Sequence, residues 1–141
     1  MNTEWSGHGY QIVGFGWHQG FNDMIGETAS AEYKDNLPDL IRDVRTVFGK
    51  PNLPFAIAST GMGAGPVESP PYTGYRTIEK APLWVAGVPR PANVPSTDAR
   101  PFWRIAADSP ADDGYHWNWN AESYFLIGKS LGDKMVGLLK A

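Results

Sequence analysis

Apolar and polar positions along the first half of the chain predict a strand, a helix and a second strand. Residues 10–17 form a short apolar, β-branched and aromatic run that leads into a polar, glycine-containing stretch over residues 18–23. This pattern is typical of a buried strand that ends in a loop. Residues 53–60 form a second such run, which ends at Gly61. Two apolar strands separated by a helix favour a right-handed βαβ unit and a parallel sheet.

The segment between these strands has the apolar spacing of an amphipathic helix. Gly49, followed by Pro51, predicts where this helix ends. An interior proline removes a hydrogen bond and clashes with the preceding turn. Pro38 therefore predicts that the regular helix begins near Asn36, after an irregular or separate turn. The apolar positions are Tyr33, Leu37, Leu40, Ile41, Val44, Val47 and Phe48.

The middle of the chain predicts loops with little regular structure. Residues 61–76 are rich in glycine and proline, and a loop of that length is usually functional or mobile. Residues 77–88 favour a short helix interrupted by a proline. Residues 94–103 favour a third strand, which its prolines place at an edge of the sheet. Residues 108–118 form a second polar loop.

The last segment predicts a long amphipathic helix over residues 120–139, because its apolar residues recur on one face. Asn118 or Asn120 is available as its N-cap. Gly128 and Gly132 lie four residues apart on or next to the apolar face. We therefore expect this helix to approach the sheet closely at the two glycines.

Length, charge and composition exclude several classes of protein. The 141 residues predict a single domain over residues 1–141, and 42% hydrophobic with 19% charged residues is a globular balance. The net charge is −3 and no cluster of Lys and Arg occurs, so nothing favours a nucleic-acid partner. No apolar run approaches the roughly 18 residues of a membrane span, and the N-terminal residues have no signal-peptide pattern. The absence of cysteine excludes disulfides and a thiol nucleophile.

Candidate chemistry gathers where the predicted strands end, which is where parallel sheets bind ligands. Asp113 lies three residues before His116, and a carboxylate hydrogen-bonded to an imidazole fixes the tautomer that a general base needs. Asn22 offers an amide that can donate to a developing oxyanion. Taken singly, these residues fit a solvated pair, an Asx turn or a helix cap equally well.

Two of these stretches together resemble one family of enzymes. Residues 14–23 (Gly-Phe-Gly-Trp-His-Gln-Gly-Phe-Asn-Asp) resemble the third sequence block of the SGNH (GDSL) hydrolases, in the Trp-x-Gln-Gly form of the sialate O-acetylesterase-like carbohydrate esterases. Residues 113–118 resemble the fifth block, Asp-x-x-His, before the C-terminal helix. The resemblance covers nearly the whole chain and is least evident over residues 63–93. It implies a three-layer α/β/α, flavodoxin-like fold with a reduced parallel sheet.

The resemblance also implies an activity and a set of roles, namely those of an esterase that removes acetyl groups from carbohydrates. His116 corresponds to the general base, Asp113 to its orienting partner and Asn22 to an oxyanion donor. The backbone of Gln19 and Gly20 shapes the pocket, and Phe21 stands where the sialate esterases often carry Glu. No cofactor is implied, and the resemblance suggests an extracellular or periplasmic enzyme. Tryptophans that could line the substrate cleft, or equally pack in the core, are Trp17, Trp103, Trp117 and Trp119.

The sequence departs from the family at its start. The Gly-Asp-Ser block that carries the family's nucleophile occurs nowhere, and only nine residues precede Tyr10. We therefore expect a chain that corresponds to the C-terminal part of an SGNH hydrolase, with the N-terminal strands missing. The nucleophile stays unknown, with Ser59 and Ser6 as the candidates. Loss of the neighbouring strand exposes a sheet edge, which predicts a homo-oligomer or a rearranged sheet that covers it.

Three functions remain open from the sequence. The first is an esterase that uses a nucleophile from elsewhere in the chain, or a water activated by His116 and Asp113. The second is an inactive remnant or carbohydrate-binding module of the same ancestry. The third is a metal-assisted hydrolase built on His8, His18 and His116, although their spacing matches no ligand motif and we expect no metal.

Overall fold

The computed structural model of the chain describes residues 9–60 and 91–140. The loop predicted over residues 61–76, the helix predicted over residues 77–88, and both Ser6 and His8 lie outside the described residues. The helices are α1 (Phe21–Ile25), α2 (Glu27–Val47) and α4 (Ala121–Leu139); the strands are β1 (Phe15–His18), β2 (Phe55–Ala58) and β3 (Ser96–Thr97); and the 3-10 turns are η3 (Arg100–Phe102), η4 (Ala106–Asp108) and η5 (His116–Trp119).

The three strands form one parallel sheet in the order β1-β2-β3. Trp17 pairs with Ile57, and Ile57 pairs in turn with Ser96. The predicted parallel pairing of the first two strands is confirmed. The third strand does lie at an edge of the described sheet, but it is much shorter than the predicted range of 94–103, because η3 follows it after two residues.

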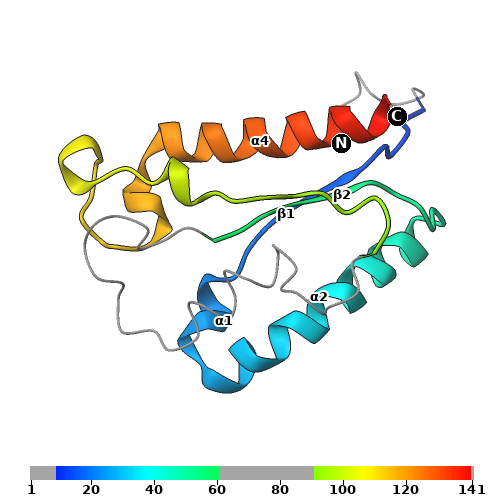
Figure 1. Cartoon of the computed structure of the whole chain (residues 1–141), viewed down its shortest axis with the longest axis horizontal. Helices are drawn as coiled ribbons and strands as arrows, with labels where there is room; N and C mark the ends of the chain where they lie inside the picture. The colour runs from blue at the N-terminus through cyan, green and yellow to red at the C-terminus, as the bar shows by residue number, and fades with distance from the viewer. Residues whose placement is uncertain (1–8, 61–90, 141) are drawn as a thin grey trace.

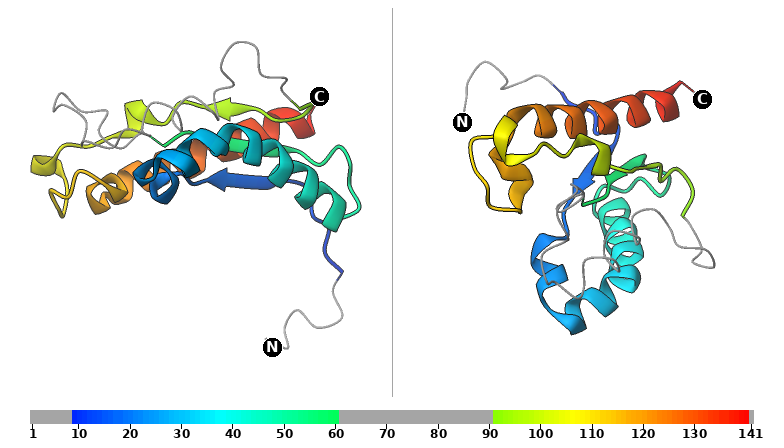
Figure 2. Two further views of the ribbon diagram at one scale, coloured as in Figure 1. Left: turned by 90° about the horizontal axis from the view of Figure 1, so that it is seen from below. Right: turned by 60° about the vertical axis from the view of Figure 1, so that its left-hand side comes forward.

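Helices cover both faces of this sheet, which gives a three-layer mixed α/β fold (Figure 1; Figure 2). Residues of α1 and α2 form a core with one face of the strands, whereas α4 packs on the other face, against β2 and β3. No helix among the described residues is both long and apolar enough to cross a membrane. The buried residues of the α2 side are Met24, Tyr33, Leu37, Ile41, Phe55, Ile57 and Val94, and those of the α4 side are Ala58, Ala99, Trp117 and Ile127.

The first two strands, β1 and β2, differ in burial. All four residues of β2 are buried, because β2 has a strand on each side and a helix over each face. β1 ends the strand order in the described sheet, and its residues are only partly buried or exposed. The predicted buried strand over residues 10–17 is wrong for its first five residues, since regular structure begins at Phe15 and Tyr10 is 90% exposed.

Pro38 does not delay the start of the helix between β1 and β2. α2 begins at Glu27 and contains Pro38 in its interior, so the predicted start near Asn36 is wrong. The N–H that Pro38 lacks would have bonded to the carbonyl of Lys34. Lys34 is exposed, so water can hydrate this carbonyl instead. Burial of Leu37, directly before the proline, anchors this part of the helix in the core.

The close approach between α4 and the sheet occurs at Gly14, next to β1, and not at the two glycines of α4. A Cβ placed on Gly128 or Gly132 would meet nothing within 4 Å, so the prediction for these two glycines is wrong. A Cβ on Gly14, just before β1, would overlap with the thioether of Met135 on α4. Asn120 is the N-cap of α4, as predicted, because its Oδ1 accepts a hydrogen bond from the backbone N–H of Ser123 at 3.1 Å.

Candidate active site

A cavity of about 260 Å³ lies at the carboxyl ends of β1 and β2. Three segments that are far apart in the sequence meet there: the end of β1 with the start of α1, Thr60 just after β2, and η5 with the start of α4. This position is the one expected for a ligand site on a parallel sheet. The cavity is lined by His18, Gln19, Gly20, Phe21, Asn22, Thr60, His116, Trp117 and Tyr124.

The wall formed by the end of β1 depends on a glycine. Gly20 is buried and has φ 147°, a conformation that side chains rarely adopt, and it turns the chain from β1 into α1. The carbonyl of Gln19 accepts a hydrogen bond from the Tyr33 hydroxyl at 3.0 Å. Burial raises the pKa of Tyr33 to about 12, so this donor keeps its proton. Asn22 lies on the cavity wall with an exposed side chain, and its role as an oxyanion donor stays a prediction.

The opposite wall is a left-handed turn. His116, Trp117, Asn118 and Trp119 have φ values of 48°, 55°, 50° and 58°. Non-glycine residues in this region store strain of roughly 1–3 kcal/mol each, and such strain concentrates at functional sites. The surrounding structure must therefore hold η5 in place, and His116 takes its position from this turn.

Asn118 holds the turn from within. It is 2% exposed, and its Oδ1 accepts a hydrogen bond from the N–H of Gly114 at 3.0 Å. Its Nδ2 donates to the carbonyl of Arg104 at 3.2 Å. On the other side of the turn, the hydroxyl of Tyr124 on α4 donates to the carbonyl of His116 at 3.0 Å. Hydrogen bonds on both sides thus fix the backbone that carries the predicted base; the two of Asn118 are partly buried, and the one from Tyr124 is exposed.

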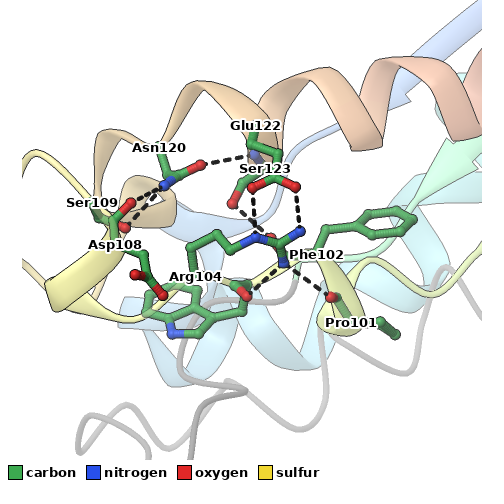
Figure 3. A network of polar contacts seen from close by, with 9 residues as sticks. Pro101, Phe102, Arg104, Asp108, Ser109, Asn120, Glu122 and Ser123 are labelled. Carbon is green, nitrogen blue, oxygen red and sulfur yellow. Dashed lines mark hydrogen bonds and ion pairs between the residues drawn. The ribbon is translucent and has the colours of Figure 1, made fainter.

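A second polar network ties the segment before η5 to the start of α4 (Figure 3). The guanidinium of Arg104 donates two hydrogen bonds to the carboxylate of Glu122, at 2.9 Å and 2.8 Å. Asn120 Nδ2 donates to the carbonyl of Asp108 at 2.7 Å. The paired bonds lower the pKa of Glu122, so the ion pair persists at mildly acidic pH. The network therefore links the segment before η5 to the helix that follows η5.

Aromatic rings surround the imidazole of His116. The ring centroids of Phe21, Tyr115 and Trp119 lie 4.8 Å, 5.0 Å and 5.6 Å from that of His116. Phe21 therefore gives the predicted base an apolar neighbour.

Asp113 has a defined partner next to His116. Its Oδ2 accepts a hydrogen bond from the indole Nε1 of Trp119 at 2.6 Å. One carboxylate oxygen is thereby fixed beside the residue whose ring packs on His116. The role of Asp113 as the partner that orients His116 stays a prediction.

His18 makes a contact that sequence reasoning missed. Its Nε2 lies 3.1 Å from Nε1 of Trp117, and its Nδ1 lies 3.3 Å from the carbonyl oxygen of Ala58. Burial lowers the pKa of His18, an effect that the Ala58 carbonyl partly offsets. His18 and Trp117 are 99 positions apart. No local pattern links them, although each lies within a stretch that resembles a block of the family.

The residues after β2 include a serine and a threonine with opposite environments. Ser59 is fully buried, and its Oγ accepts a hydrogen bond from the N–H of Ala99 at 3.0 Å. Thr60 lines the cavity, and its buried Oγ1 has no hydrogen-bond partner among the residues the structure describes. No serine from the described residues lines this cavity.

The predicted tryptophans take different places. Trp117 lines the cavity and is 2% exposed, whereas Trp119 is 55% exposed beside it. Trp17 lies outside the cavity lining, packs against the α2 core and donates from Nε1 to the Tyr33 hydroxyl at 3.4 Å. Trp103 packs on Trp117, with ring centroids 5.9 Å apart.

The third functional hypothesis, a metal site, has no geometric support in the described part of the chain. Within residues 9–60 and 91–140, no three His, Asp or Glu side chains cluster closely enough to hold a metal ion. Both ring nitrogens of His18 already have protein neighbours, at Trp117 and Ala58.

A small parallel sheet with helices on both faces and a cavity at the strand ends defines a mixed α/β protein of the SGNH-like class. The family model described as "Carbohydrate esterase, sialic acid-specific acetylesterase" matches residues 2–136, and the chain therefore belongs to this family of carbohydrate esterases. A search of curated proteins gave no match.

A solved structure supports the fold independently. The X-ray structure of a protein from Arabidopsis thaliana superposes with a TM-score of 0.66 and 22% sequence identity. The match covers 90% of this chain and 45% of the plant protein, so this chain spans less than half the length of that relative.

Proposed function

We propose that the chain hydrolyses acetyl esters of carbohydrates at the cavity between β1 and η5, with His116 as general base. The observation that carries the proposal is the meeting of His116 and Asn22 in one cavity, although they come from opposite ends of the chain. Membership of the carbohydrate esterase family supports the class of substrate. The cavity volume of about 260 Å³ suits an acetyl group with part of a sugar.

The proposed reaction uses these residues in sequence. The imidazole of His116 takes the proton of a water or hydroxyl nucleophile, whose oxygen bonds to the acetyl carbonyl carbon. The carbonyl electron pair moves onto its oxygen, where the amide of Asn22 donates a hydrogen bond. When this pair returns, the bond to the sugar oxygen breaks, and the leaving oxygen takes the proton from His116. With water as nucleophile, acetate and the free sugar result directly.

Asp113 acts through His116 in this scheme. A carboxylate next to the imidazole stabilises the imidazolium that forms when the proton is taken. The hydrogen bond from Trp119 occupies Oδ2 of Asp113. In the proposed scheme the other oxygen, Oδ1, accepts a hydrogen bond from the His116 ring. Gln19 and Gly20 shape the pocket through their backbone, and Trp117 provides part of its floor.

Hydrolysis of p-nitrophenyl acetate, and release of acetate from an O-acetylated sialic acid and from an O-acetylated neutral sugar, test this function. We expect His116→Ala to lower kcat by roughly 100-fold or more, the usual contribution of a general base. Asp113→Asn should also lower kcat, whereas Asp112→Asn, a change at the exposed neighbouring aspartate, should not. Equal rates for the parent, His116→Ala and Asp113→Asn would overturn the proposal.

The nature of the nucleophile has its own test. Rapid quenching followed by mass spectrometry would show an acetyl group on the protein if a serine attacks first, and none if water attacks directly. The burial of Ser59 and its bond to Ala99 favour the water route. An acetylated peptide that contains Ser59 or Ser6 would establish the serine route instead.

A second function, sugar binding without turnover, is favoured by one observation: no serine lines the cavity in the part of the chain that the structure describes. Isothermal titration of the parent with the same acetylated sugars distinguishes the two functions. Heat of binding without acetate release supports a binding module. Acetate release that His116→Ala abolishes supports the esterase.

We also propose that β1 forms the interface of a homo-oligomer. Phe15 N–H bonds to the carbonyl of Pro54 on the β2 side, at 2.9 Å. Because the bonds of a parallel strand alternate between its two sides, the N–H of the exposed Gly16 points to the open edge of the described sheet. Sedimentation at a series of dilutions should show association that Gly16→Pro abolishes and Gly132→Ala does not. A compact monomer at every concentration would contradict this.

A further inference from the structure

We propose that His18 is a positioning residue for His116: its neutral imidazole holds Trp117, and with it the strained turn η5, and its protonation releases that hold. The effect on catalysis rests on the proposed function. The structural part, a hydrogen bond that protonation breaks, stands without it. The proposal begins from the bond between Nε2 of His18 and Nε1 of Trp117 at 3.1 Å.

The chemistry of the two rings fixes the tautomer of His18. An indole nitrogen carries a hydrogen and can only donate, so Nε2 of His18 must be the acceptor and carries no proton. The single proton of the neutral ring is then on Nδ1, which lies 3.3 Å from the carbonyl oxygen of Ala58 and donates to it. A carbonyl can only accept, so both contacts require the same neutral tautomer.

The bond to His18 ties η5 to the sheet. Asn118 joins the turn to Arg104, and Tyr124 joins it to α4, but the Trp117 indole reaches the end of β1. The ring of Trp117 is 2% exposed and packs with its centroid 5.7 Å from that of His18. Because η5 contains four left-handed residues, it relaxes toward ordinary backbone conformations when a restraint is lost. His116 is the first residue of the turn and moves with it.

Protonation of His18 places two N–H groups against each other. An added proton on Nε2 would point at the N–H of Trp117, which turns an attractive contact into a repulsive one in a partly buried site. Burial lowers the pKa of His18, which supports the neutral form near pH 7. The His18 ring is therefore neutral and accepts the bond from Trp117 at neutral pH, and it loses this bond on acidification.

The groups packed around His18 do not supply a counter-charge. Asp23 on α1 is bonded to the Gln19 amide, and Tyr33 on α2 donates to the Gln19 carbonyl. From the opposite wall, the titratable groups that share the cavity are His116 and Tyr124. Of the carboxylates that the structure describes, none forms a hydrogen bond or ion pair with the His18 ring. An imidazolium at His18 is thus without a stabilising partner from these elements.

The first experiment follows the indole N–H of Trp117 by nitrogen-15 NMR in the full chain. Comparison with Trp117→Phe assigns its resonance, and the indole of Trp17, bonded to Tyr33, is the internal control. Between pH 7.5 and 5, we expect the Trp117 resonance to move with a midpoint below the ordinary histidine value of 6.5 while that of Trp17 stays. A Trp117 resonance that does not move with pH would overturn the proposal.

Two substitutions separate the holding bond from its titration. His18→Gln keeps a carbonyl oxygen that can accept from Trp117 but cannot be protonated in this range, so the Trp117 resonance should stop titrating. His18→Leu removes the acceptor and should displace the resonance at every pH. Circular dichroism checks that both variants are folded. If either variant unfolds, the titration in the parent chain still decides the matter.

Activity provides the second readout. His18→Leu should lower kcat roughly tenfold with little change in KM, the effect typical of losing a bond that orients a site residue. His18→Gln should retain more activity and shift the acid limb of kcat/KM to lower pH. An unchanged acid limb in His18→Gln would exclude the positioning role. A parent chain without any esterase activity would refute the proposed function, and a titrating Trp117 resonance would still confirm the His18 hold.

Discussion

The indole Nε1 of Trp119 donates a hydrogen bond to Oδ2 of Asp113 over 2.6 Å, and the ring of the same tryptophan packs 5.6 Å from that of His116. The Trp119 side chain therefore contacts both the proposed general base, His116, and its proposed orienting partner, Asp113. Trp119 is 55% exposed, so the hydrogen bond accounts for its fixed place better than burial does. The relationship makes Trp119 a support for the orientation of the Asp113 carboxylate.

Trp119→Phe tests this support, because it keeps an aromatic ring beside His116 and removes the N–H. We expect kcat on p-nitrophenyl acetate to fall several-fold, less than for Asp113→Asn, since the carboxylate loses its partner but not its charge. KM should change little. A kcat equal to that of the parent would show that Asp113 does not depend on Trp119 for its orientation.

Asn118→Ala should destabilise the protein by about 2–3 kcal/mol. The substitution leaves the N–H of Gly114 and the carbonyl of Arg104 without their buried partner. It also places alanine in a left-handed conformation that asparagine tolerates better. Urea unfolding measures the loss, and Asn36→Ala, at an exposed position of α2, is the control that should lose nothing. Equal midpoints for the two variants would contradict the anchoring role of Asn118.

Local sequence patterns predicted those elements that neighbouring residues are enough to specify. The strand-helix-strand order follows from apolar runs, and the N-cap of α4 follows from an asparagine before a helical stripe. The start of α2 was predicted wrongly from Pro38. The cost of an interior proline depends on whether solvent can hydrate the carbonyl four residues before it, which the sequence does not record.

The parts of the site that the sequence did not predict depend on contacts between distant segments. Trp117 and His18 meet only because η5 crosses to the end of β1, and nothing near either residue specifies the other. The left-handed turn at His116 is also set by its surroundings, since tryptophan and histidine do not favour positive φ. Sequence motifs thus located the predicted base and its loop, but not the bonds that hold the loop.

Two glycine substitutions should change stability in opposite directions. Gly14→Ala brings a methyl group into the space of the Met135 thioether, the flexible end of that side chain, and should lower the free energy of unfolding by no more than about 1 kcal/mol. Gly132→Ala adds a methyl group where nothing lies within 4 Å, on an exposed helix position, and should raise it by about 0.5–1 kcal/mol. Thermal unfolding of both variants measures the difference. Restoration of Gly14→Ala by Met135→Ala would identify the clash, and a lack of any restoration would argue against it.

The neighbouring residues Ser59 and Thr60 form a matched pair. Ser59→Ala removes the acceptor of the buried Ala99 N–H and should destabilise the protein by about 1–3 kcal/mol. Thr60→Val removes a buried hydroxyl that has no partner among the described residues and should stabilise it by about 1 kcal/mol. Chemical denaturation compares the two. A loss of stability in Thr60→Val would mean that its hydroxyl is hydrogen-bonded in solution, for instance to water in the cavity.

Stability should fall on mild acidification because of His18. Its folded-state pKa lies below the ordinary value of 6.5, so the unfolded chain takes up a proton first as the pH falls. The contribution of the neutral ring is complete above about pH 6.5 and is lost below it, by at most ~1.4 kcal/mol per pH unit, until the folded pKa is reached. Urea unfolding of the parent at pH 7.5 and 5.5 measures this loss.

His18→Gln is the control for this pH dependence, because glutamine does not titrate. Asp98, whose pKa is lowered chiefly by its hydrogen bond from the Arg100 side chain, loses its contribution only below its ordinary 3.8 and does not enter the chosen range. The difference in unfolding free energy between parent and His18→Gln should therefore shift against the parent between pH 7.5 and 5.5. A constant difference across that range would mean that His18 has the same pKa in the folded and unfolded chains. The partly buried bond to Trp117 would then not depend on the protonation of His18.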